Sequence, residues 1–219
     1  MDQDVIGPAG LHEARGAIEE LAPVLRRAAS LDPSTLARIR IRGGRASVML
    51  RLPFGVLVGR TVAAQAPDEP IDVVVRAPEL LAWLDGDAPD PPGSRDADWR
   101  GGLPPVAGWQ RVDTVPDHVI RNLVRSGART LQQAAERDGM PGAQPRAEVT
   151  DALLDSVVLT VRAEGGLQAA ITLRMVSALT RMGFLPRGSH AGVDVAGRWL
   201  RVAAEYGSVF AERGGLNIL

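Results

Sequence analysis

Apolar residues recur at three- and four-residue spacing in two long segments, which predicts two amphipathic helices. The first helix is expected over residues 10–29, where Pro23 would bend or divide it, and its apolar stripe is Leu11, Ala14, Ile18, Leu21 and Leu25. The second is expected from about residue 113 to 139, with Asp113 or Thr114 as its cap and Pro116 in its first turn. Its stripe is Ile120, Leu123, Val124, Gly127, Ala128, Leu131 and Ala135.

The remaining periodic segments alternate with a period of two or are short and apolar, which predicts strands. Strands are expected over 38–51, 56–63, 71–76, 155–174 and 197–213, and two short helices over 77–86 and 175–184. Several of these segments are joined by glycine-bearing turns, as hairpins are. The pattern therefore predicts an α+β fold, with a mainly antiparallel sheet of hairpins and the two longer helices packed on one face.

Residues 86–110 are dense in Pro, Gly and Asp and show no period, so they are expected to form a long loop. We expect a single α+β domain over 1–219, within which two halves, 1–85 and 111–219, are joined by this loop. The stretches "VLVGR…IDVVVRAPELLAWLDG" and "VVLTVR…AAITLRMVSALTRMGF" share the order strand, strand, short helix. A pseudo-repeat of the two halves and a chance recurrence both explain this echo.

The stretch "RIRIRGGRASVMLR" has the clearest register in the sequence. A Gly43-Gly44 turn favours a two-residue hairpin, because both central positions need positive φ. It sets Arg42 opposite Arg45 and Arg38 opposite Met49. One face is then apolar, with Ile39, Ile41, Ala46, Val48 and Leu50, and the other, which we name the arginine face, carries Arg38, Arg40, Arg42, Arg45 and Arg51.

Five arginines on one sheet face require counterions, since like charges directly opposite one another destabilise a sheet. Three sources are open. Solvent is the first, with the guanidinium groups in water. The protein itself is the second, through an aspartate-rich loop that carries Asp85, Asp87, Asp90, Asp96 and Asp98. The third is a partner that carries phosphate or acidic side chains.

The last segment, "GRWLRVAAEYGSVFAER", alternates like a closing hairpin. A two-residue Tyr206-Gly207 turn would set Arg201 opposite Glu212 and Ala203 opposite Phe210. The first of these pairs would satisfy its charges internally, as in a structural sheet.

Composition changes this picture mainly by exclusion. The 219 residues carry a net charge of −1, with no cysteine and, among 25 basic residues, no lysine. Disulfides, thiolate metal sites, P-loop ATPases and Schiff-base enzymes are thereby excluded. No apolar run is long enough to span a bilayer, and the first residues do not resemble a secretory signal. We expect a cytoplasmic protein with no cofactor, no metal and no membrane association.

Candidate chemistry is sparse. His12, His118 and His190 show no metal-ligand spacing. The loop "FLPRGSHAGVD" gathers Arg187, Ser189, His190 and Asp194, but adjacent Ser-His does not readily form a nucleophile–base pair. Trp99 and Trp109 lie in the 86–110 loop, where they would anchor the loop or contact a partner. Trp99, Trp109, Arg187 and His190 are therefore candidate loop contacts.

Three functions remain open at this point. The leading one is a non-catalytic binding or adaptor protein that engages a protein partner, or a second copy of itself, through the arginine face or the Trp-bearing loop. The second is a binder of a phosphate-bearing ligand or nucleic acid through the Arg38–Arg51 hairpin, although few aromatic residues accompany these arginines. The third is an enzyme of unfamiliar type centred on the Arg187–Asp194 loop.

Overall fold

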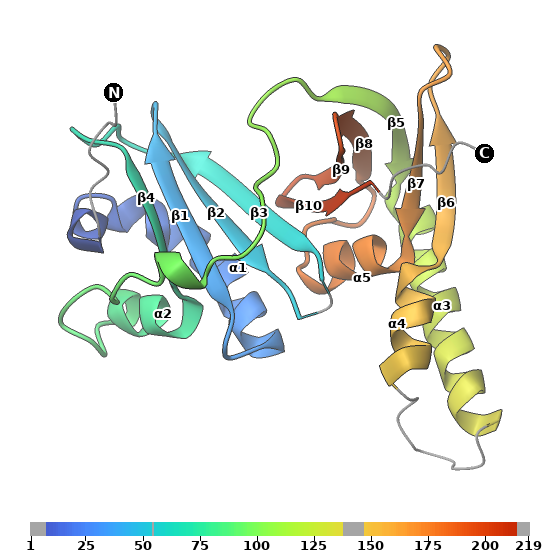
Figure 1. Cartoon of the computed structure of the whole chain (residues 1–219), viewed down its shortest axis with the longest axis horizontal. Coiled ribbons are helices and arrows are strands. Elements are labelled where there is room, and N and C mark those ends of the chain that lie inside the picture. Colours follow the sequence, from blue (N-terminus) through green and yellow to red (C-terminus); the bar gives the residue numbers. More distant parts are fainter. Residues whose placement is uncertain (1–7, 54, 138–146, 214–219) are drawn as a thin grey trace. The chain divides into compact units, whose positions relative to one another are not determined.

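The computed structural model describes residues 8–53, 55–137 and 147–213, and the chain divides into two units, residues 1–103 and 104–219 (Figure 1). The boundary falls within the Pro-, Gly- and Asp-rich segment 86–110. Each unit combines antiparallel strands with helices, so the predicted α+β class is confirmed. In the described ranges, no helix is both long and apolar enough to cross a membrane.

The first unit places a four-stranded antiparallel sheet, in the order β4-β1-β2-β3, against helix α1. Its elements are η1 (Pro8–His12), α1 (Arg15–Leu31), β1 (Leu36–Arg42), β2 (Arg45–Arg51), β3 (Leu57–Ala63), β4 (Ile71–Arg76), α2 (Ala77–Asp85) and η2 (Asp96–Asp98). Pro23 lies inside α1, which continues past it. Helix α2 ends at Gly86, whose φ of 86° is the left-handed cap that glycine favours.

The β1–β2 hairpin has the predicted register, from Arg42 opposite Arg45 to Arg38 opposite Met49. Gly43 and Gly44 have φ values of 57° and 74°, as the tight turn requires. The five apolar residues of the inner face, Ile39, Ile41, Ala46, Val48 and Leu50, are fully buried. The arginine face therefore lies on the side of the sheet away from this core.

The second unit contains the sheet β5-β8-β9-β10 and a separate two-stranded sheet, β6-β7. Its elements are β5 (Gln110–Pro116), α3 (Asp117–Arg137), α4 (Ala147–Asp155), β6 (Val157–Arg162), β7 (Gln168–Thr172), α5 (Leu173–Arg181), β8 (His190–Ala196), β9 (Trp199–Ala204) and β10 (Gly207–Glu212). Helix α3 packs on α5. A Cβ at Gly127 of α3 would lie 2.5 Å from the Leu173 side chain, so glycine permits this close approach.

The expected start of the second long helix was wrong, because residues 110–116 form strand β5 and the helix begins at Asp117. The strand has a β-bulge between Arg111 and Asp113. The bulge shifts the alternation, so that the buried residues Val112 and Val115 are three apart. A spacing of three between buried residues is typical of a helix, so the sequence pattern predicted a helix where the structure has strand β5.

The expected register of the closing hairpin was also wrong. Arg201 lies opposite Phe210, not Glu212, and the residues between the strands are Glu205 and Tyr206. Gly207 is the first residue of β10, and a Cβ there would lie 2.7 Å from the Phe184 ring. This glycine therefore provides space for an aromatic ring rather than a turn.

The structure supports the pseudo-repeat in the order of its elements. In both units two strands precede a short helix that starts at the residue after the second strand: β3, β4 and α2 in one, β6, β7 and α5 in the other. The pairing of these strands differs. β6 and β7 pair with each other, whereas β3 and β4 lie at opposite ends of the β4-β1-β2-β3 series.

Candidate functional site

Part of the arginine face is neutralised by an aspartate of the neighbouring strand. Asp72 of β4 lies opposite Arg40. Its Oδ1 accepts a hydrogen bond from Arg38 Nε at 2.6 Å and its Oδ2 one from Arg38 Nη2 at 2.9 Å, while Arg40 Nε lies 3.2 Å from Oδ2. The hydrogen bond to Asp72 and the charges of Asp72 and Asp96 outweigh partial burial and raise the pKa of Arg38. The protein thus supplies the counterion of two of the five arginines.

The segment around η2 lies along β4 and reaches the arginine face. Arg95 N donates to Val74 O, and Val74 N donates to Asp96 Oδ1, both at 2.7 Å. The Trp99 ring centroid is 6.0 Å from Arg38 Cζ and 5.8 Å from Arg51 Cζ, within cation–π range. The loop therefore contributes an aromatic cover and one nearby carboxylate to this face.

Other aspartates of the loop are engaged elsewhere. Asp85 forms two hydrogen bonds with Arg26 of α1, at 2.6 and 2.8 Å. Asp98 lies 3.8 Å from Arg95. These two carboxylates pair with arginines outside the arginine face.

Three arginines of the face are exposed and, within the described part of the chain, make no ion pair: Arg42, Arg45 and Arg51. Arg42 and Arg45 lie opposite each other at the hairpin turn. Arg51, at the far end of β2, donates from Nη2 to Arg100 O at 2.5 Å. Both ends of the face thus remain positively charged towards solvent.

A pocket of about 390 Å³ adjoins the Arg51 end of this face. Its lining includes the guanidinium-bearing residues Arg51 and Arg100, the Trp99 ring, and the hydroxyl-bearing Ser34 and Thr35. Asp32 and Asp98 also line it. The pocket therefore combines an aromatic wall with charged groups of both signs.

The second unit contains a similar cluster around Asp194 of β8, whose side chain is only 3% exposed. Arg111 Nε donates to Asp194 Oδ1, and Arg201 Nε donates to Oδ2 at 3.0 Å. The Trp109 ring covers Arg201, with Cζ 4.3 Å from the ring centroid, and Trp109 Nε1 donates to Pro105 O at 2.9 Å. Each unit thus holds an aspartate, an arginine of the next strand and a tryptophan from the segment between residues 86 and 110.

Sequence reasoning missed both aspartates as partners of these arginines. The signal at Asp72 was a single acid in the apolar strand "IDVVVR". Its meaning depends on β4 pairing with β1, which brings Asp72 opposite Arg40. No local pattern specifies that pairing.

The Arg187–Asp194 loop does not assemble a catalytic set. Ser189 Oγ donates to Pro186 O at 2.8 Å, and Asp194 is bound to two arginines. His190 is exposed and lies four residues before Asp194 on β8, a separation of about 13 Å at strand geometry. Arg187 is also exposed. The structure therefore does not bring serine, histidine and aspartate within hydrogen-bonding distance of one another.

The same loop is fastened to the start of α3. Asp117 N donates to Ser189 O at 3.0 Å. Arg121 donates to Asp117 Oδ2 at 3.2 Å and to Leu185 O at 2.6 Å. Burial acts to raise the pKa of the Asp117 carboxyl. Hydrogen bonds from Arg121 and from the backbone of Gly188 and His118 act in the opposite direction and are stronger, so the pKa is lowered overall.

Helix α3 carries a basic stripe that sequence reasoning also missed. Arg121, Arg125 and Arg129 are spaced by four residues and so lie on one side of the helix. Arg125 and Arg129 are exposed and donate to the neutral acceptors Asn122 Oδ1 and Ser126 Oγ. No acidic residue occurs in the sequence between Asp117 and Glu136. The fourfold spacing of arginine was the available signal.

Comparisons with solved structures identify the fold as similar to that of sliding clamps. The DNA polymerase sliding clamp from Pseudomonas aeruginosa with ligand is 11% identical with a TM-score of 0.52, covering 92% of this chain and 64% of that one. The clamp from Caulobacter crescentus is 12% identical with a TM-score of 0.53, covering 94% and 66%. The Helicobacter pylori beta clamp bound to a DNA ligase peptide is 10% identical with a TM-score of 0.51, covering 91% and 64%. The chain thus spans about two thirds of the length of these clamps.

No curated protein matches the sequence. Residues 10–101 match the model of a domain of unknown function, DUF8010. Residues 104–216, more than half of the chain, match a second domain of unknown function, DUF8185. The chain belongs to the DUF8185 family.

Proposed function

We propose that this protein is a non-catalytic binding or adaptor protein that engages an acidic surface of a partner protein through the arginine face. The observation that carries the proposal is that Arg42, Arg45 and Arg51 are exposed and make no ion pair with the described residues, although Asp72 pairs with their neighbours. Arginine is well suited to this role, because its planar guanidinium group binds carboxylates through two parallel hydrogen bonds.

Two further features support a protein partner. Trp99 and its pocket lie at the Arg51 end of the face, and tryptophan and arginine are the residues that most often dominate the energy of protein interfaces. The fold is similar to that of sliding clamps, one of which is described as bound to a DNA ligase peptide. A non-catalytic adaptor needs no assembled active site, and the Arg187–Asp194 loop provides none.

Binding of nucleic acid is the second candidate, and the stripe on α3 favours it. Arg125 and Arg129 are exposed and have no acidic neighbour along about five turns of the helix, an arrangement that suits contacts with phosphates. The Arg38–Arg51 hairpin is the other surface available for this function, through Arg42 and Arg45.

The test is a titration of the full chain with labelled polyglutamate and with a short labelled DNA duplex, each at two salt concentrations. We expect polyglutamate to bind and the double variant Arg42→Gln/Arg45→Gln to bind about tenfold more weakly, since each exposed ion pair contributes up to about 1 kcal/mol. Arg27→Gln, on the exposed side of α1, removes one arginine charge from the opposite layer and should leave binding unchanged.

The outcome for DNA separates the two candidates. If DNA binds more tightly than polyglutamate, with a steep salt dependence that weakens in Arg125→Gln/Arg129→Gln, the nucleic-acid function replaces the adaptor function. If neither polyanion binds, or if the Arg42/Arg45 double variant binds polyglutamate like the wild type, the proposed role of the arginine face is wrong.

A further inference from the structure

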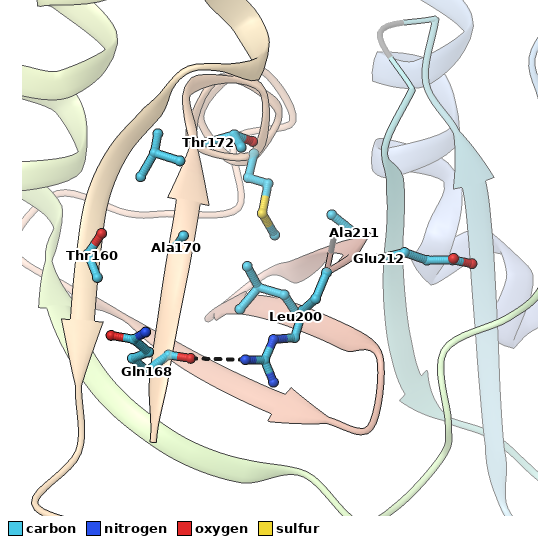
Figure 2. Close-up of a pocket in the computed structure, with 10 residues that line it drawn as sticks. Thr160, Gln168, Ala170, Thr172, Leu200, Ala211 and Glu212 are labelled. Atoms are coloured by element: carbon cyan, nitrogen blue, oxygen red, sulfur yellow. Dashed lines mark hydrogen bonds between the residues drawn. The ribbon is translucent and has the colours of Figure 1, made fainter. Parts of the chain in front are cut away.

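A groove of about 360 Å³ lies in the second unit between strand β7 and the β9–β10 hairpin (Figure 2). Met175 of α5, Leu200 of β9 and Ala211 of β10 supply much of its apolar wall. Ala170, in the middle of β7, lines the groove and is exposed. The volume falls within the range of sites that hold a ligand or several side chains.

Strand β7 has an edge beside this groove that pairs with no strand among the described residues. It pairs with β6 on one side only. At the turn between β6 and β7, Ala163 N donates to Leu167 O at 2.8 Å, so these two residues form a hydrogen-bonded pair. Along an antiparallel ladder, hydrogen-bonded and non-hydrogen-bonded pairs alternate, so the pairs that contain Gln168 and Ala170 are non-hydrogen-bonded. The alternation directs the backbone groups of Gln168 and Ala170 away from β6.

Arg213 confirms this direction and marks one end of the edge. Its Nη2 donates to Gln168 O at 3.3 Å; in Figure 2 a dashed line marks this hydrogen bond at Gln168. The backbone N–H and C=O of Ala170 have no partner among the described residues. Arg213 likewise makes no ion pair within the described part of the chain.

We infer that β7 accepts an extended segment of a partner protein as a third strand, with apolar side chains in the groove and an acidic side chain on Arg213. An unpaired strand edge binds a segment whose backbone is extended, because only such a segment can form the main-chain hydrogen bonds of a sheet. These hydrogen bonds provide affinity, and the adjacent pocket selects the side chains of the bound segment. The guanidinium group of Arg213, at the Gln168 end, has no ion pair within the described residues, so it favours a negative charge there. In an antiparallel addition to β7, this charge belongs to the C-terminal end of the bound segment.

A second copy of β7 meets these requirements less well than a partner segment. The β7 side chains that line the groove are Gln168, Ala170 and Thr172. None of them is acidic or a large apolar group. A second β7 would therefore leave the groove unfilled and would bring no carboxylate to Arg213. This site lies in a different unit from the arginine face, and the inference is independent of the proposed function.

The probe is a short labelled peptide of alternating valine and threonine with a C-terminal aspartate, titrated into the full chain and followed by fluorescence anisotropy. Two N-methylated forms of the peptide carry the methyl groups on alternate sets of amides. We expect one form to bind at least tenfold more weakly and the other to bind like the parent, because only one set of N–H groups faces β7. Replacing the aspartate by asparagine should weaken binding about fivefold.

Two protein variants test the same contacts. Ala170→Pro removes the outward N–H without removing a hydrogen bond to β6, and is expected to weaken binding at least fivefold. Arg213→Gln should abolish the preference for aspartate over asparagine. Arg181→Gln, an exposed arginine at the end of α5, is the matched control and should retain that preference.

The N-methylated peptides keep the test decisive even if Ala170→Pro does not fold, because they leave the protein unchanged. Equal binding of both N-methylated forms, or no binding of the parent peptide at its highest soluble concentration, overturns the inference. A concentration-dependent dimer that Ala170→Pro abolishes, seen by sedimentation, would assign the edge to a second copy and overturn it as well.

Discussion

Asp72→Asn is the substitution that most directly tests how the arginine face is held together. The asparagine keeps the shape of the side chain but removes the charge that Arg38 contacts at 2.6 and 2.9 Å and Arg40 at 3.2 Å. A hydrogen bond to a charged group contributes about 1.5–3 kcal/mol when well shielded, whereas an exposed ion pair contributes at most about 1 kcal/mol. The side chains of Asp72, Arg38 and Arg40 are between 23% and 28% exposed. The energy of their contacts is therefore expected to lie between that of a shielded hydrogen bond to a charge and that of an exposed ion pair.

We therefore expect Asp72→Asn to lower the free energy of unfolding by about 2 kcal/mol in total, with a drop in Tm of about 4–8 °C. Urea denaturation followed by tryptophan fluorescence measures this change, and Trp99 reports on the face itself. Added salt should recover part of the loss, since it screens the repulsion among the arginines. The variant should also bind polyglutamate more tightly than the wild type, because Arg38 and Arg40 are released.

Asp68→Asn is the matched control, because Asp68 is exposed and makes no ion pair within the described residues. It should change the free energy of unfolding by less than about 0.5 kcal/mol. A similarly small change for Asp72→Asn, with no gain in polyanion affinity, would refute the reasoning that this carboxylate neutralises part of the face.

Two further predictions concern the second unit. Asp117 has a lowered pKa, so its contribution to stability is present above the ordinary carboxyl pKa of about 4 and is lost as the pH falls through the lower folded value. The urea midpoints of the wild type and of Asp117→Asn, measured between pH 7 and pH 2, should therefore differ, and the difference should shrink below about pH 4. A difference that stays constant over this range would contradict the lowered pKa of Asp117. Gly207→Ala places a methyl group 2.7 Å from the Phe184 ring and should cost about 1–3 kcal/mol, measured by thermal unfolding. Gly165 has no positive φ, and a Cβ there would have no atom within 4 Å, so Gly165→Ala should change the free energy of unfolding very little. Equal losses of stability in the two variants would show that the Phe184 ring moves to make room for the methyl group.

The two aspartate–arginine–tryptophan clusters relate the units chemically as well as topologically. Asp72, Arg38 and Trp99 in one unit correspond in kind to Asp194, Arg201 and Trp109 in the other. In each, a strand aspartate orients the guanidinium group and an aromatic ring covers it. This shared arrangement adds a side-chain likeness to the repeated order of strand, strand and short helix.

Local signals in the sequence were sufficient for the first hairpin and for the α+β class. Gly43 and Gly44 define the register alone, because a two-residue turn with positive φ at both positions leaves one pairing of the flanking residues. The inner and outer faces then follow from the alternation of side chains along a strand. The arginine face was therefore predictable residue by residue.

Tertiary structure decided what those arginines meet and how the second unit is built. Asp72 became their counterion only because β4 pairs with β1, and strand pairing across a long sequence separation leaves no local trace. The β-bulge gave β5 the spacing of a helix, and the Phe184 ring, not a turn, explains Gly207. The sequence by itself determined the elements whose geometry depends on neighbours along the chain. Contacts between distant segments set the pairing of the strands, the register of the last hairpin and the edge that β7 leaves unpaired among the described residues.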